Sequence, residues 1–96
     1  MHARVTTLRG APGDVDAGIE NFRENVVPFA REQGKGALLL VDRQSGEAIA
    51  ITLWEDEDKL RASEEAANAL RAGAADELGA TEAPAVARYE VAGFEV

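Results

Sequence analysis

The amino-acid sequence predicts an α+β domain of the ferredoxin-like kind, in which a βαββαβ chain forms one four-stranded antiparallel sheet. Three observations predict it. Two stretches carry apolar residues at helical spacing, a tight hairpin lies between them, and a β-favouring segment stands near each end of the chain. With 96 residues and no evident linker, the chain fits a single domain over residues 1–96.

The first strand and helix are predicted over residues 3–34. Residues 3–9 favour a strand because they are rich in Val and Thr, and a Gly-Pro turn follows. Asp14 is placed to cap a helix, whose apolar residues recur in steps of four and three: Val15, Ile19, Phe22, Val26 and Phe29. Pro28 predicts a kink or a restarted last turn, and Gly34 predicts a left-handed end to the helix.

A hairpin occupies the middle of the chain. Strands are predicted over residues 36–43 and 47–54, joined by a turn in which Gly46 suits a positive φ. In the second of these strands, the large aliphatic residues share one face, and Ala48, Ala50, Thr52 and Trp54 share the other. We expect the larger face to meet the helices, and it consists of Ile49, Ile51 and Leu53.

The second helix follows an acidic run at residues 55–58, where negative charge favours the start of a helix. One apolar stripe continues to a predicted stop at Gly79, and its members are Leu60, Ser63, Ala67, Leu70, Ala74 and Leu78. A connector containing Pro84 leads to a final strand predicted over residues 86–96.

The central strands predict a homodimer. Helices can cover only one face of this sheet, yet both faces of the stretch from Leu38 to Val41 are apolar. Leaving apolar surface wet forfeits about 25 cal/mol per Å². A second copy of the same face is the simplest symmetric cover. A monomer with a small, tolerant open face is the alternative.

Composition excludes several classes of function. The formal net charge of −8 disfavours binding to nucleic acid or to anionic membranes. No apolar run is long enough to span a bilayer and no signal-peptide pattern is present, so a cytoplasmic location is expected. His2 is the single histidine and there is no cysteine, so we expect no metal site. We expect no cofactor either, because no phosphate-cradling glycine motif is present.

Four residues are candidates for binding a ligand in the space between helices and sheet. Trp54 offers an apolar wall with one donor, and Tyr89 on the last strand offers a phenol. Asn68 and Arg71 stand three residues apart on the second helix. The simpler interpretation is that the aromatic residues belong to the core or a dimer interface and that Arg71 forms a surface ion pair.

The sequence resembles the antibiotic biosynthesis monooxygenase-like group of dimeric α/β-barrel proteins. The resemblance covers the order of elements and, most specifically, residues 51–60, where a strand ends in Trp-Glu before a helix begins. Residues 34–36 and 88–91 also fit. It implies a dimer whose sheets form a barrel and a ligand cavity between each sheet and its helices. Some members oxidise aromatic polyketides without metal or flavin. Trp54 is the matched strand-end residue.

The chain departs from that pattern in two ways. Ser63 stands where many members carry a histidine on the second helix. The residues used by the haem-degrading branch are missing, because the first strand has no asparagine and the second helix has neither tryptophan nor histidine. The predicted function is therefore binding of a small apolar or aromatic molecule, with cofactor-independent oxygenation of an aromatic or polyketide-like substrate as the implied activity. The alternative is a non-catalytic dimeric binding or stress-related scaffold domain.

Overall fold

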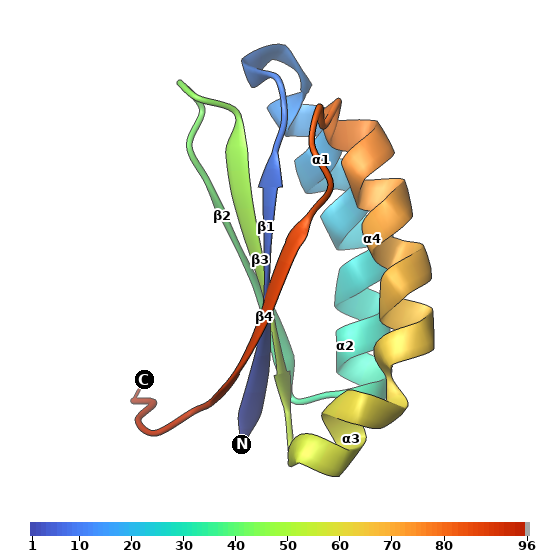
Figure 1. The fold of residues 1–96 in the computed structure, drawn as a ribbon, viewed down its shortest axis with the longest axis vertical. Coiled ribbons are helices and arrows are strands. Elements are labelled where there is room, and N and C mark those ends of the chain that lie inside the picture. The colour runs from blue at the N-terminus through green and yellow to red at the C-terminus, as the bar shows by residue number, and fades with distance from the viewer. Residues whose placement is uncertain (96) are drawn as a thin grey trace.

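The sheet has the predicted ferredoxin-like topology. The computed structural model describes residues 1–95, and its four strands lie in the order β2-β3-β1-β4 with every neighbouring pair antiparallel. All helices lie on one side of the sheet, and the other side is open (Figure 1). The strands are β1 (His2–Arg9), β2 (Gly36–Val41), β3 (Glu47–Trp54) and β4 (Ala85–Glu90).

Two helical segments cross over between the strands. The first contains a 3₁₀ turn, two α-helices and a π-helical turn between them: η1 (Pro12–Asp14), α1 (Val15–Asn21), η2 (Phe22–Val26) and α2 (Val27–Gln33). The second segment contains α3 (Glu57–Ala62) and α4 (Glu64–Leu78).

The predicted restart near Pro28 is confirmed, and the predicted left-handed end at Gly34 is wrong. The Val27 N–H bonds to the Phe22 carbonyl five residues back, and α2 begins with Pro28 in its first turn. Gly34 has an extended backbone with φ −117°. Glycine is needed there for a different reason, because a Cβ would lie 2.7 Å from the Leu53 carbonyl oxygen. The helix end therefore approaches the β3 backbone closely.

The second helix breaks at Ser63, where the sequence predicted one continuous stripe. The Leu60 carbonyl accepts hydrogen bonds from the Ser63 N–H (3.2 Å) and Oγ (2.6 Å), and also from the Arg4 guanidinium (3.0 Å). These bonds occupy the carbonyl that a continuous helix would pair with Glu64. Arg4 on β1 therefore stabilises the break between α3 and α4. The predicted stop at Gly79 is confirmed, with φ 67°.

The last strand is shorter than predicted. β4 ends at Glu90, whereas the sequence predicted a strand to residue 96. One further bond joins the Val91 N–H to the Met1 carbonyl (2.8 Å), and residues 91–95 then leave the sheet on the side opposite the helices (Figure 1). Val96 lies outside the described residues. This tail leaves Phe94 65% exposed.

The faces of β3 are the reverse of the prediction. The face that carries Ala48, Ala50 and Thr52 together with Trp54 meets the helices, and Ile49, Ile51 and Leu53 lie on the open face. Trp54 explains the reversal, because its side chain is 1% exposed and its ring packs edge-on against Phe29 at 5.6 Å. The alanines on the same face let the helices come close to the sheet.

Gly46 and Gly73 are expected to respond oppositely to an added methyl group. Gly46 has φ 83°, and a Cβ there would lie 2.4 Å from the Gly10 carbonyl oxygen. Gly46→Ala should therefore lower the free energy of unfolding by about 2 kcal/mol or more. Gly73 lies inside α4 with nothing within 4 Å of an added Cβ. Gly73→Ala should raise the stability by about 0.5–1 kcal/mol. Urea titrations of both variants test this, and equal effects would contradict it.

Candidate ligand pocket

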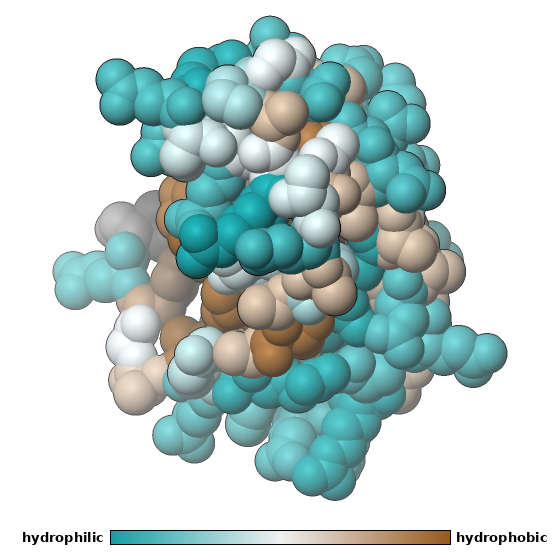
Figure 2. All heavy atoms as spheres, turned by 45° about the horizontal axis from the view of Figure 1, so that its top comes forward, coloured by the Kyte–Doolittle hydropathy of each residue, from teal (hydrophilic) through white to brown (hydrophobic). Residues whose placement is uncertain are grey.

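A small apolar pocket lies between the sheet and the helices. Its volume is ≈ 50 Å³. In Figure 2, brown apolar atoms are visible in a recess bordered by teal hydrophilic atoms. The walls come from β1, β3, α4, η2 and α2, and the lining residues are Arg4, Thr6, Leu8, Val26, Phe29, Ala50, Thr52, Ala67, Leu70, Arg71 and Ala74. Apart from two threonines, the two arginines are the only polar members of this lining.

Arg4 is a buried charge at one end of the pocket. It alternates with Thr6 and Leu8 on the helix-facing side of β1, and only 3% of it is exposed. One of its terminal nitrogens donates to the Leu60 carbonyl (3.0 Å), the Ser63 Oγ (2.7 Å) and the Glu64 carboxylate (3.1 Å). These bonds compensate for much of the cost of removing the charge from water.

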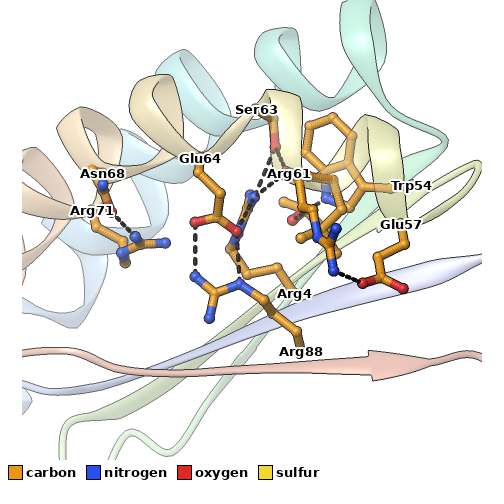
Figure 3. Close-up of polar contacts among 11 residues, drawn as sticks. Arg4, Trp54, Glu57, Arg61, Ser63, Glu64, Asn68, Arg71 and Arg88 are labelled. Atoms are coloured by element: carbon orange, nitrogen blue, oxygen red, sulfur yellow. Dashed lines mark hydrogen bonds and ion pairs between the residues drawn. The ribbon is translucent and has the colours of Figure 1, made fainter.

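Glu64 connects the pocket to the edge strand. Its carboxylate accepts from Arg4 and also takes two bonds from Arg88 on β4, at 2.7 and 2.8 Å. Figure 3 shows the carboxylate between the two guanidinium groups. The hydrogen bonds from Arg88, together with those from Arg4, lower the pKa of Glu64 from 4.5 to about 2. This carboxylate therefore stays ionised at any ordinary pH and holds α4 to both β1 and β4.

The ion pairs of Glu64 are expected to break in acid, when its carboxylate becomes protonated. Because the pKa is lower in the folded state, ionised Glu64 stabilises the fold above pH 4.5, and this contribution is lost as the pH falls from about 4.5 towards 2. Glu64→Gln should have a lower melting temperature at pH 6 and a shallower loss of stability across that window. Thermal melts at pH 2–6 measure both.

The matched control for this titration is Glu65→Gln, which removes the exposed neighbouring carboxylate. Its pH profile should parallel that of the wild type. A Glu64→Gln profile that also parallels the wild type below pH 4.5 would show that the ion pairs contribute nothing to stability.

Arg71 and Asn68 lie together on α4, and Arg71 lines the pocket. The two residues lie one turn apart on α4, and an Arg71 Nη donates to the Asn68 Oδ1 (Figure 3). The other terminal nitrogen of Arg71 is buried and has no hydrogen-bond partner among the described residues. Burial lowers the pKa of Arg71, and repulsion from Arg4 lowers it further. Asn68 is exposed and reaches the pocket only through Arg71.

Trp54 and Tyr89 do not line the pocket. Trp54 lies behind the pocket wall, where its ring centroid is 5.4 Å from the Arg4 guanidinium carbon and its Nε1 donates to the Thr52 Oγ1 at 3.0 Å. Tyr89 pairs with Ala3 on β1 and lies on the open face of the sheet, 57% exposed. The structure thus does not bring Tyr89 to the space between sheet and helices.

Sequence reasoning missed Arg4 and Glu64. The signal for Arg4 was available, because an arginine in the middle of a strand alternates with the apolar Leu8 on the face that should be buried. In the sequence, Glu64 looks like its neighbour Glu65, and only its three-dimensional pairing with Arg4 on β1 and Arg88 on β4 distinguishes the two.

A second cavity adjoins the first. It has a volume of ≈ 30 Å³ and shares Leu8, Val26, Ala50 and Ala74 with the lining of the larger pocket. Four side chains therefore separate two small spaces along one helix–sheet interface. Within residues 1–95, no group of three or more His, Cys, Asp or Glu side chains is arranged to hold a metal ion. No helix in the same range is both long and apolar enough to cross a membrane.

Comparison with solved structures defines the class of fold. The chain matches the crystal structure of a monooxygenase from the gene ActVA-Orf6 of Streptomyces coelicolor in complex with nanaomycin D, with a TM-score of 0.78 and 17% identity over 99% of this chain and 90% of that one. It matches the crystal structure of an antibiotic biosynthesis monooxygenase with a TM-score of 0.66 and 17% identity, over 97% and 100%. The chain therefore shares the ferredoxin-like fold of these monooxygenases.

Relatives by sequence come from Mycobacterium tuberculosis. The chain is 37% identical over 94 residues to the uncharacterized protein Rv2557 of strain H37Rv, a match that covers 96% of this chain and 41% of that protein. It is 43% identical over 77 residues to the uncharacterized protein Rv2558 of the same strain, covering 78% and 33%. The chain therefore spans less than half the length of these curated relatives. No family model matches the sequence.

Proposed function

We propose that this domain binds a small apolar or aromatic molecule between its sheet and helices, as one half of a homodimer. The observation that carries the proposal is the pocket itself, where apolar walls meet a small number of convergent polar groups. That combination is typical of small-molecule sites. Two of its relatives in fold are monooxygenases, one of them in complex with nanaomycin D.

The homodimer is proposed from the open face of the sheet. Leu38 and Leu40 on β2 are 51% and 47% exposed, and they pair with Ile51 and Ile49 on β3. Val5 on β1 pairs with Ile51 from the other side. An apolar surface that crosses three strands is a site for protein association. A second copy is the occupant we propose, because the tail carrying exposed Phe94 leaves the sheet on this same side (Figure 1).

Ligand binding requires the pocket to widen. Pockets for drug-sized ligands have volumes of about 300–1,000 Å³, against ≈ 50 Å³ for this one. The pocket can widen towards the neighbouring cavity, because Val26 and Ala74 line both spaces. An outward shift of the part of α4 around Ala74 would join the two cavities, and the α4 residues that line both spaces or adjoin them there are mainly small.

The activity proposed for the pocket is cofactor-independent oxygenation by O₂. In an anthrone-type substrate, the methylene group becomes a carbonyl, one atom of O₂ enters the product, and the other leaves as water with the two methylene hydrogens. The reacting species is the substrate's own anion. Arg71, positioned by Asn68, would stabilise that anion, and the apolar walls would exclude water.

The small size of the pocket favours a second candidate function. A helix–sheet interface largely closed by side chains suits a non-catalytic dimer that acts as a binding or scaffold domain. In that case the open face of the sheet would remain the functional surface, and no small molecule would enter between sheet and helices.

Trp54 provides the readout that separates the two functions. It is the single tryptophan, and its ring contacts Arg4 and Phe29, which both line the pocket. A panel of planar phenols, including dihydroxyanthrones, is titrated while Trp54 emission is followed, and then incubated with and without O₂. Binding and an O₂-dependent product support the oxygenase. Binding without product limits the domain to binding, and no emission change across the panel supports the scaffold.

A matched pair of variants locates the site. Ala74→Leu fills the space shared by the two cavities and should weaken binding at least about tenfold. Ala72→Leu adds the same atoms to an exposed position of the same helix and should leave binding unchanged. Equal affinities for both variants would place the ligand elsewhere.

A further inference from the structure

The polar end of the pocket holds more positive charge than its neighbours neutralise. Arg4, Arg71 and Arg88 gather around one carboxylate, that of Glu64, on a chain whose overall net charge is −8 (Figure 3). Glu64 is fully engaged by Arg4 and Arg88. Arg71 has a side-chain amide as its hydrogen-bond partner, which supplies no negative charge.

Two buried donors at this end are unpaired. The Arg4 Nε and one Arg71 Nη have no hydrogen-bond partner among residues 1–95, although both residues line the pocket. Arg4 itself is 97% buried, since only 3% of its surface is exposed. Buried charged donors are ordinarily satisfied, and an unsatisfied one costs more than a neutral group. A partner with acceptor oxygens and negative charge would satisfy both.

We infer that Arg4 and Arg71 form an oxyanion site, and that the molecule bound in the pocket is a flat apolar acid. Its carboxylate or acidic phenol oxygen would lie between the two guanidinium groups, and its ring would lie against the apolar wall formed by Ala67, Leu70 and Ala74. Asn68 serves as a positioning residue, because it occupies one terminal nitrogen of Arg71 while the other remains unpaired. This inference rests on the proposed ligand-binding function and specifies its substrate class.

A pair of ligands with the same rings tests whether the site prefers a negatively charged ligand. 2-Naphthoate carries the oxyanion, and 2-naphthamide is its neutral counterpart. Isothermal titration calorimetry should show that the wild type binds the naphthoate at least about tenfold more tightly, the scale of one charged hydrogen bond. Acetate supplies the anion without the ring, and should shift the Nε–Hε signals of Arg4 and Arg71 in the ¹⁵N spectrum.

Arg71→Met should weaken the binding of naphthoate more than that of naphthamide and so remove most of the preference for naphthoate. Arg61→Met removes an equal charge from an exposed arginine outside the pocket, and should keep the preference. Asn68→Ala should reduce the preference and retain naphthamide binding.

The outcomes show whether the oxyanion site, the apolar pocket or both have failed. Equal affinity for the two naphthyl ligands in the wild type overturns the oxyanion site and leaves the apolar pocket standing. Acetate-induced arginine shifts without naphthyl binding keep the oxyanion site and overturn the apolar pocket. No naphthyl binding and no arginine shift overturn both.

Discussion

Replacing Ile51 with lysine is expected to convert a dimer into monomers. Ile51 lies on the open face of β3, between Val5 on β1 and Leu38 on β2, at the centre of the apolar surface. In a two-fold symmetric interface, one substitution places two lysines in the contact. Burying an unpaired charge costs several kcal/mol per ion. The dimer dissociation constant should therefore rise by at least roughly a thousandfold.

The control for this substitution is Ala72→Lys, which adds the same charge to the exposed face of α4. Size-exclusion chromatography with light scattering should return the wild-type mass for Ala72→Lys and half of it for Ile51→Lys. Circular dichroism checks that both variants are folded. An unchanged mass for folded Ile51→Lys would show that the open face is not the contact.

Among the substitutions proposed for this chain, Leu78→Ala is expected to cause the largest loss of stability. Leu78 is 1% exposed at the end of α4, where it packs with Leu8 and Ala48 in the core. Two of its neighbours, Gly10 and Gly18, have no side chains that could fill the space. Truncating a buried leucine under these conditions costs about 3–5 kcal/mol. Urea unfolding at one fixed protein concentration measures this loss.

Leu70→Ala is the comparison for this prediction. Leu70 is half-buried on the same helix and lines the pocket, which is already partly open. Its truncation should cost roughly 1–2 kcal/mol, because less contact is lost and less new cavity is created. Equal losses of stability for the two variants would show that the deeper burial of Leu78 adds nothing to its contribution.

The order of elements could be read from the sequence because each element has a local cause. The bounds of β3 follow from its alternation and from the turn at Gly46, and the restart at Val27 follows from Pro28. The break at Ser63 is only partly local, because the Ser63 Oγ donates to the Leu60 carbonyl three residues back. It also depends on an arginine 59 residues away in the chain, whose guanidinium bonds to Ser63 Oγ and to the Leu60 carbonyl.

The faces of β3 show why alternation alone is insufficient. Alternation correctly divided the strand into two sets, but volume was the wrong guide to which set meets the helices. Trp54 belongs to the set that otherwise consists of small residues, and its burial decides the orientation. This orientation favours association with a second copy, since the branched aliphatic residues Ile49, Ile51 and Leu53 lie on the open face.

The site could be predicted only in part. Arg71 and Asn68 follow from helical spacing beside the apolar stripe, and their pairing is local. The participation of Arg4 and Glu64 depends on contacts between β1 and α4, which no local pattern contains. Tyr89 lies on the open face because its register opposite Ala3 sets the direction of its side chain.

The central claim is that a second copy of the chain covers the apolar face of the sheet. Sedimentation equilibrium of the wild-type chain at micromolar concentration tests it most directly. We expect a single species of twice the 10.2 kDa chain mass. A stable species of 10.2 kDa throughout that range would contradict the claim, because Leu38, Leu40 and Ile51 would then remain in contact with water.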